Sequence, residues 1–164
     1  MVYCIGDRVL YGIHGVCQIV EIQMQTINKK LVEYYVLEPV SQVGARFFVP
    51  SQNEKAVAKL RPVLTREQAD VLMHTANLKS VTWSDDDNEK KKYYSELISS
   101  GDRAELLAMI RILRNYKQQQ LQAGKKFHVN DANFLKEAEK MLFGELSTVL
   151  EIPYEQIESY IAWD

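Results

Sequence analysis

The sequence predicts an α+β protein, with a small, strongly bent antiparallel β-barrel or sheet followed by a compact bundle of about five α-helices. From residue 3 to residue 50, short segments rich in β-branched and aromatic residues are separated by hairpin-length turns, which is typical of antiparallel strands. After Pro62, apolar residues recur every three or four positions, which is the period of an amphipathic helix. We therefore predict two domains, residues 1–63 and 64–164.

Four or five short strands are expected in the first domain, four of them at residues 7–11, 16–22, 32–37 and 46–49. Turn signals separate them, such as Gly-Ile-His-Gly at 12–15 and Asn-Lys-Lys at 28–30. In the second strand, plain alternation places Ile22 on the face opposite Ile19. This part is too short for a sandwich and has no βαβ repeat.

Helix boundaries are visible in the second domain. Thr65 and Gln68 form a capping box before a short helix, and Asp102 is the expected N-cap of a long one. Another long helix is expected over 131–150, and Pro153 lies in the first turn of a last short helix. The apolar stripe of the helix after Asp102 includes Leu106, Leu107, Ile110, Leu113 and Leu121.

After the short helix that follows Thr65, residues 81–94 have the sequence VTWSDDDNEKKKYY. Ser84 or Asp85 can cap a helix that begins near Asp86, and acids in a first turn complement the positive end of the helix dipole. Trp83 has two interpretations. It packs at the seam between the domains, or it presents a flat aromatic tip to a partner, since apolar side chains can enter a DNA minor groove at a base step.

Composition and charge describe an ordinary globular protein, with 46% hydrophobic and 26% charged residues. No apolar run approaches the roughly 20 residues that cross a membrane, and the first residues lack a signal-peptide pattern, so we expect a cytoplasmic protein. The net charge is −2; residues 1–63 carry seven Lys or Arg against five Asp or Glu, and the remainder carries thirteen against seventeen. Neither part is a basic DNA-binding module of the usual kind, so any DNA contact must be local and assisted.

Neither a catalytic site nor a metal site is expected. Cys4, His14 and Cys17 supply three potential zinc ligands, but the fourth is missing, and a free Cys in a strand pattern behaves as a small hydrophobe. The chain has no nucleophile elbow, phosphate loop, dinucleotide fingerprint or HExxH helix. The acids at 85–87 are consecutive, so they splay around a helix start and do not converge as an acid/base pair. We predict a non-enzymatic protein without a cofactor.

Several short motifs follow one another in a specific order. In the first domain they are Ile5-Gly6-Asp7, Val9-Leu10-Tyr11, His14-Gly15-Val16, Tyr34-Tyr35-Val36-Leu37 and Val49-Pro50. In the second they are Ser100-Gly101-Asp102, Gly124-Lys125-Lys126-Phe127-His128 and Leu135-Lys136-Glu137-Ala138-Glu139-Lys140. In this order and spacing they resemble the CarD family of bacterial transcription regulators over essentially the whole chain.

The resemblance implies a Tudor-like (SH3-like) barrel, shared with the transcription-repair coupling factor, that docks on the RNA polymerase β subunit. It also implies a helical domain that binds promoter DNA. There a Trp, matched here by Trp83, wedges into the minor groove at the upstream edge of the −10 element and stabilises the open complex. Tethering through polymerase raises the local concentration, so a weak DNA contact suffices. We expect a monomer with no membrane partner.

The resemblance and the charge pattern together give candidate contact residues. For DNA they are Trp83, Lys90, Lys91, Lys92, Arg111, Arg114, Lys117, Lys125 and Lys126. Some family members place basic residues directly after the Trp, where this chain has Ser84-Asp85-Asp86-Asp87. Phe47 and Phe48 are neighbours, so one of them points out of the sheet and is a natural protein-binding anchor. For polymerase the candidates are Gln25, Thr26, Asn28, Arg46 and Phe48.

Two other functions fit the sequence. In the first, the protein is an adaptor that binds polymerase or another protein without touching DNA, and Trp83 belongs to the core. In the second, the first domain binds RNA or single-stranded DNA, which is disfavoured because aromatic and basic residues do not cluster there. The exposure of Trp83 and the charge around it separate the adaptor from the DNA-binding regulator.

Overall fold

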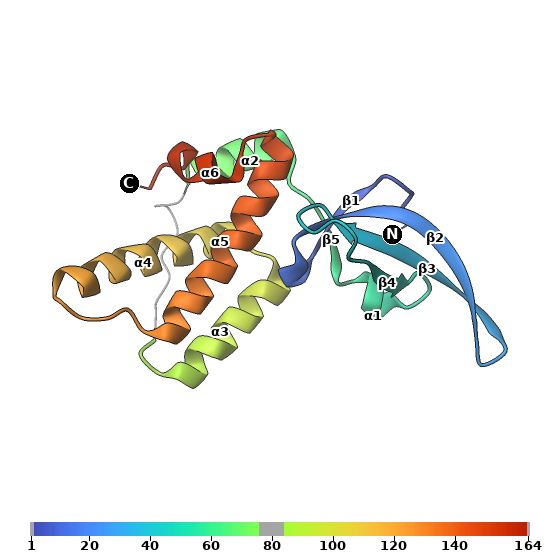
Figure 1. Ribbon diagram of the computed structural model, residues 1–164, viewed down its shortest axis with the longest axis horizontal. Helices are drawn as coiled ribbons and strands as arrows, with labels where there is room; N and C mark the ends of the chain where they lie inside the picture. The colour runs from blue at the N-terminus through green and yellow to red at the C-terminus, as the bar shows by residue number, and fades with distance from the viewer. Residues whose placement is uncertain (1, 76–83, 164) are drawn as a thin grey trace. The chain divides into compact units, whose positions relative to one another are not determined.

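The computed structural model describes residues 2–75 and 84–163, which divide into two compact units, Met1–Val63 and Leu64–Asp164 (Figure 1). The first unit is built around an antiparallel sheet, and the second is built of helices. The α+β class predicted from the sequence is therefore confirmed.

The sheet of the first unit has five strands in the order β4-β3-β2-β1-β5, and every neighbouring pair is antiparallel. The strands are β1 (Arg8–Tyr11), β2 (Val16–Ile27), β3 (Lys30–Pro39), β4 (Phe47–Pro50) and β5 (Leu60–Pro62). Two short helices lie in the connections, the 3-10 helix η1 (Gly12–His14) and α1 (Glu54–Val57). Alternation predicts the first four strands but neither β5 nor α1, because both are too short to display a period.

β2 and β3 form a long, curved hairpin (Figure 1). Its two turn residues, Asn28 and Lys29, have φ values of 51° and 66°, as a two-residue type I′ turn requires. The register shifts just after Ile19, where β2 carries a bulge. The extra residue reverses the alternation beyond it. Ile22 therefore pairs with Tyr35 and shares the face of Ile19, so the prediction from plain alternation was wrong.

The core of the first unit lies on one face of this sheet. Ile19 of β2 and Leu37 of β3 are fully buried there, and Val49 of β4 packs beside them. Burying side chains of this size contributes roughly 1.5–3 kcal/mol each before the entropy of ordering them is subtracted. On the opposite face of β3 and β4, Val36 is also fully buried, whereas its partner Phe48 is 47% exposed.

The second unit has five helices within the described residues: α2 (Arg66–Met73), α3 (Asp87–Ser100), α4 (Arg103–Gln122), α5 (Val129–Leu150) and α6 (Tyr154–Tyr160). The predicted capping box is confirmed, since Thr65 and Gln68 each accept from the other's backbone N–H. Asp102 caps α4 as predicted, by accepting from the Glu105 N–H at 3.0 Å. Pro153 is the N-cap of α6 and not a residue of its first turn.

α5 packs against α2, α4 and α6 and is the central element of the second unit (Figure 1). Leu142 and Leu146 of α5 meet the buried side chains Leu107 and Leu113 of α4 in a shared core. The predicted stripe of α4 stops before Leu121, which is 57% exposed because it lines a groove open to solvent. Of the helices that the structure describes, none combines the length and the apolar character needed to span a membrane.

Candidate nucleic-acid and partner interfaces

The start of α3 is capped by Asp86. Its Oδ1 accepts from the backbone N–H groups of Asn88 and Glu89 at 2.9 and 3.0 Å. The Ser84 hydroxyl accepts from the Asp86 N–H and donates to the Glu89 carboxylate at 2.6 Å. The N-cap is therefore Asp86, one residue after the predicted Asp85. The interpretation of these acids as the start of a helix is confirmed.

Lys90 faces the interior of the second unit. Its side chain donates to both carboxylate oxygens of Asp131, at 3.1 and 3.3 Å. Lys90 is 7% exposed and Asp131 is 1% exposed. A buried ammonium that neutralises a buried carboxylate is not available to a DNA phosphate. We therefore correct the sequence-based assignment and do not keep Lys90 among the candidate DNA contacts.

Two tyrosines fix α3 against its neighbours. Tyr94 stacks on Phe134 with ring centroids 4.8 Å apart, and its hydroxyl donates to Glu137 at 2.9 Å. The Tyr93 hydroxyl donates to Glu105 of α4 at 2.7 Å. Burial, and after it these carboxylate acceptors, raises the pKa of both phenols. α3 is tied to both α4 and α5, so its first turn has a defined place in the unit.

Four exposed lysines lie on α3 and in the loop before α5. They are Lys91, Lys92, Lys125 and Lys126. The Lys90–Asp131 pair joins the first turn of α3 to the first turn of α5, which brings the first two lysines to the end where the loop before α5 carries the others (Figure 1). Exposed Asp85 and Asp87 lie at the start of the same helix, so the region is mixed in charge. Trp83 lies outside the described residues.

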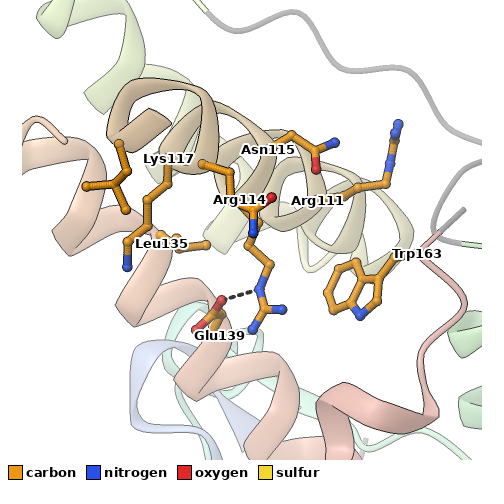
Figure 2. Close-up of a pocket in the computed structure, with 9 residues that line it drawn as sticks. Arg111, Arg114, Asn115, Lys117, Leu135, Glu139 and Trp163 are labelled. Atoms are coloured by element: carbon orange, nitrogen blue, oxygen red, sulfur yellow. Dashed lines mark hydrogen bonds and ion pairs between the residues drawn. The ribbon is translucent and has the colours of Figure 1, made fainter. Parts of the chain in front are cut away.

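Arg114 belongs to an internal network of the second unit. Its Nε donates to Glu139 at 2.7 Å, its Nη1 donates to Glu158, and its guanidinium lies 4.7 Å from the ring centroid of Trp163 (Figure 2). Burial lowers the pKa of Arg114, but hydrogen bonds to the two carboxylates outweigh it and raise the pKa overall. Arg114 therefore ties α4 to α5 and α6, and we do not keep it as a DNA contact. Arg111, one turn earlier, is half-buried.

Phe48 is the outward-pointing member of the Phe pair. It is 47% exposed on β4, while Phe47 packs against the core. Arg46 forms an ion pair with Glu21 at 3.7 Å. Glu21 and Phe48 both pair with Val36 of β3, so Arg46 and Phe48 lie on the same face of the sheet. An exposed ring beside a cation is the arrangement expected of a protein-binding anchor.

The other three residues predicted to bind polymerase lie towards the tip of the hairpin. The register places Gln25 on the Phe48 face and Thr26 on the opposite one, and Asn28 forms the turn. The structure thus brings Gln25, Arg46 and Phe48 to one face and separates Thr26 from them.

An apolar strip on the other face of this hairpin was not predicted. Ile22, Met24 and Leu31 are 37%, 54% and 71% exposed, and they continue the face that forms the core further along the strands. The bulge after Ile19 brings them to that face, so only the pairing of β2 with β3 reveals the strip.

The potential zinc ligands do not converge. The His14 ring lies against Phe47 and Tyr11 in a tilted arrangement, with ring centroids 4.2 and 5.3 Å away. Cys17 is fully buried, which raises the pKa of its thiol to about 11, whereas Cys4 is exposed. Across residues 2–75 and 84–163, no group of three or more His, Cys, Asp or Glu side chains is placed to hold a metal ion.

Two family models match the chain. Residues 3–64 match the CarD-like/TRCF RID domain, and residues 69–162, more than half of the chain, match the CarD C-terminal domain. The chain belongs to the CarD family. Its members are non-enzymatic transcription factors, and the protein is accordingly transcription-related and interacts with RNA polymerase. The sheet unit corresponds to the first match and the helical unit to the second.

Proposed function

We propose that this CarD family member regulates transcription initiation by bridging RNA polymerase and promoter DNA. The first unit binds the polymerase β subunit, and the second unit stabilises the promoter open complex. The protein acts as a monomer. Trp83 enters the minor groove at the upstream edge of the −10 element. The observation that carries the proposal is the match of both parts of the chain to the family, with Trp83 just before the capped start of α3.

The exposed lysines support a weak DNA contact at the same end of the second unit. Lys91 and Lys92 follow the α3 cap, and Lys125 and Lys126 add two cations from the loop before α5. The neighbouring acids and the net charge of −2 limit the strength of this contact. A tether to polymerase compensates, because it converts DNA binding into an intramolecular event with a high effective concentration.

The Phe48 face supports the polymerase contact. An exposed aromatic ring flanked by Arg46 combines apolar area with a cation, and such residues are the ones that dominate protein interfaces. Gln25 extends this face along the hairpin. We propose Phe48 as the anchor, with Arg46 and Gln25 around it.

The proposal is tested by the lifetime of the promoter open complex with saturating wild-type protein or Trp83→Ala. We expect the variant to shorten the lifetime roughly tenfold, since one stacked base is worth about 1–3 kcal/mol and 1.4 kcal/mol changes a rate tenfold. Trp163→Phe is the matched control, because it alters the other of the two tryptophans and keeps an aromatic ring.

The exposed strip of Ile22, Met24 and Leu31 favours one alternative, an adaptor that joins polymerase to another protein without touching DNA. If Trp83→Ala folds normally and keeps the full lifetime while polymerase binding persists, the adaptor replaces the DNA-binding regulator.

A further inference from the structure

A groove of about 460 Å³ runs along α4 in the second unit (Figure 2). Arg111, Asn115 and Gln118 of α4 line one side, at the spacing that brings helical residues to one face. Leu135 of α5 lines the other side, and Trp163 stands at one end. The volume falls in the range of small-molecule sites, roughly 300–1,000 Å³.

The charges of the groove leave a place for an anion. Arg114 is balanced by Glu139 and Glu158, both of which it binds. Lys117 is exposed, and its ammonium has no carboxylate partner within the part of the chain that the structure describes. Lys117 is therefore the cation of this groove that is available to an anion.

The indole of Trp163 is a rigid flat wall. Its Nε1–H donates to the Glu158 backbone oxygen at 3.1 Å. The Arg114 guanidinium carbon lies 4.7 Å from the indole ring centroid, and the Phe143 ring centroid lies 6.4 Å from it. Arg114 covers one face of the ring, so a planar ligand packs on the other face. A ring that is already fixed loses little entropy when a ligand packs on it. Base–aromatic stacking contributes about 1–3 kcal/mol per base.

Figure 2 shows Lys117 and Trp163 at opposite ends of the groove. Arg111 and Lys117 are about 9 Å apart along the helix axis, from the rise per residue. Because Arg111 lies at the Trp163 end of the groove (Figure 2), this length of α4 leaves room for a molecule with a phosphate at one end and a planar ring at the other. Asn115 and Gln118 lie between the ends and carry amides that both donate and accept hydrogen bonds.

We propose that this groove binds a nucleotide, with its phosphate at Lys117 and its base against Trp163. The nucleotide is either free or part of an unpaired strand, because the chemistry of recognition is the same for both. This site goes beyond the proposed function, since binding requires neither polymerase nor a promoter.

The test uses full-length Trp83→Phe, in which Trp163 is the only remaining tryptophan of the chain's two. Its fluorescence is titrated with AMP, adenosine, inorganic pyrophosphate and a short oligothymidylate. We expect AMP to quench Trp163 with a dissociation constant below about 1 mM. Adenosine and pyrophosphate should bind about tenfold more weakly than AMP, because each lacks one of the two recognised groups.

Lys117→Gln in the same background should weaken the binding of AMP about tenfold. Lys136→Gln is the matched control, since Lys136 is exposed on α5 outside the groove and its loss should leave AMP binding unchanged. Circular dichroism establishes that both variants are folded. Both positions are exposed, so neither change disturbs the core.

Quenching by oligothymidylate without AMP binding would assign the site to an unpaired strand and uphold the proposal. Three results would overturn it: no quenching by either nucleotide probe up to about 10 mM, pyrophosphate binding as tightly as AMP, or equal effects of Lys117→Gln and Lys136→Gln. None of these results bears on the Trp83→Ala lifetime, so the proposed function stands or falls separately.

Discussion

Three adjacent lysines of α3 have different surroundings because of helical geometry. Successive residues are about 100° apart around a helix, so when Lys90 points inward to Asp131, Lys91 and Lys92 point outward. The inward lysine is buried together with the carboxylate to which it donates. Desolvating either ion alone costs several kcal/mol, and their mutual attraction offsets that cost.

We expect Lys90→Met to lower the free energy of unfolding by about 3–5 kcal/mol, because it leaves Asp131 as an unpaired buried charge. Lys91→Met should change it by less than about 0.5 kcal/mol, since Lys91 is exposed. Equilibrium denaturation followed by circular dichroism measures both. A Lys90→Met variant as stable as Lys91→Met would show that the buried pair does not hold α3.

The spacing of apolar residues in the sequence indicates that Lys90 points inward. Tyr94 and Leu97, both buried, lie four and seven residues after it, on the same helical face. Lys90 was nevertheless predicted to contact DNA, because its partner, Asp131, is 41 residues away in the sequence. The contact of Arg114 with Glu139, Glu158 and Trp163 escaped prediction for the same reason.

At the scale of elements, α3 is defined by its cap and by its attachment to α4 and α5. Asp86 satisfies two backbone N–H groups at the N-terminus, where acids also complement the helix dipole. The acids next to Trp83 therefore have a structural role, and they also place negative charge where we propose that DNA lies.

Substitutions of Asp86 distinguish its role as a helix cap from the effect of its negative charge on DNA binding. Asp86→Ala removes the cap and should destabilise the protein by about 0.5–2 kcal/mol, whereas Asp86→Asn caps equally well and should not. Because Asp86→Asn also removes a negative charge, we expect it to lengthen the open-complex lifetime at low salt. Thermal unfolding checks the first effect and promoter kinetics the second. Equal destabilisation by Ala and Asn would contradict the capping account.

Elements fixed by neighbouring residues were predictable, and elements fixed by distant ones were not. The capping box of Thr65 and Gln68 and the turn at Asn28 depend on a few consecutive residues. The bulge after Ile19 depends on how β2 pairs with β3. The face of the sheet on which Met24 lies depends on the same pairing. Short β5 exists because β1 supplies its hydrogen-bonding partner.

At the scale of the whole molecule, two units with different surfaces are joined in one chain. One exposes an aromatic ring and a cation on a sheet, and the other exposes four lysines on α3 and in the loop before α5. Neither surface is extensive enough to suggest tight binding on its own. Linking them lets two weak contacts act together, which is the physical basis of the proposed bridge.

The central claim is that one unit recruits the protein to polymerase and the other acts on DNA. It is tested most directly by titrating the open-complex lifetime with wild type, Phe48→Asp and Trp83→Ala, with Val43→Asp as a control at another exposed apolar residue. We predict that Phe48→Asp raises the half-maximal concentration by about tenfold or more and keeps the plateau, because it weakens only recruitment. Trp83→Ala should lower the plateau towards the lifetime without protein even at saturation, because recruitment through the first unit persists while the DNA contact is lost. A full plateau with Trp83→Ala, or no shift with Phe48→Asp relative to Val43→Asp, would contradict the account.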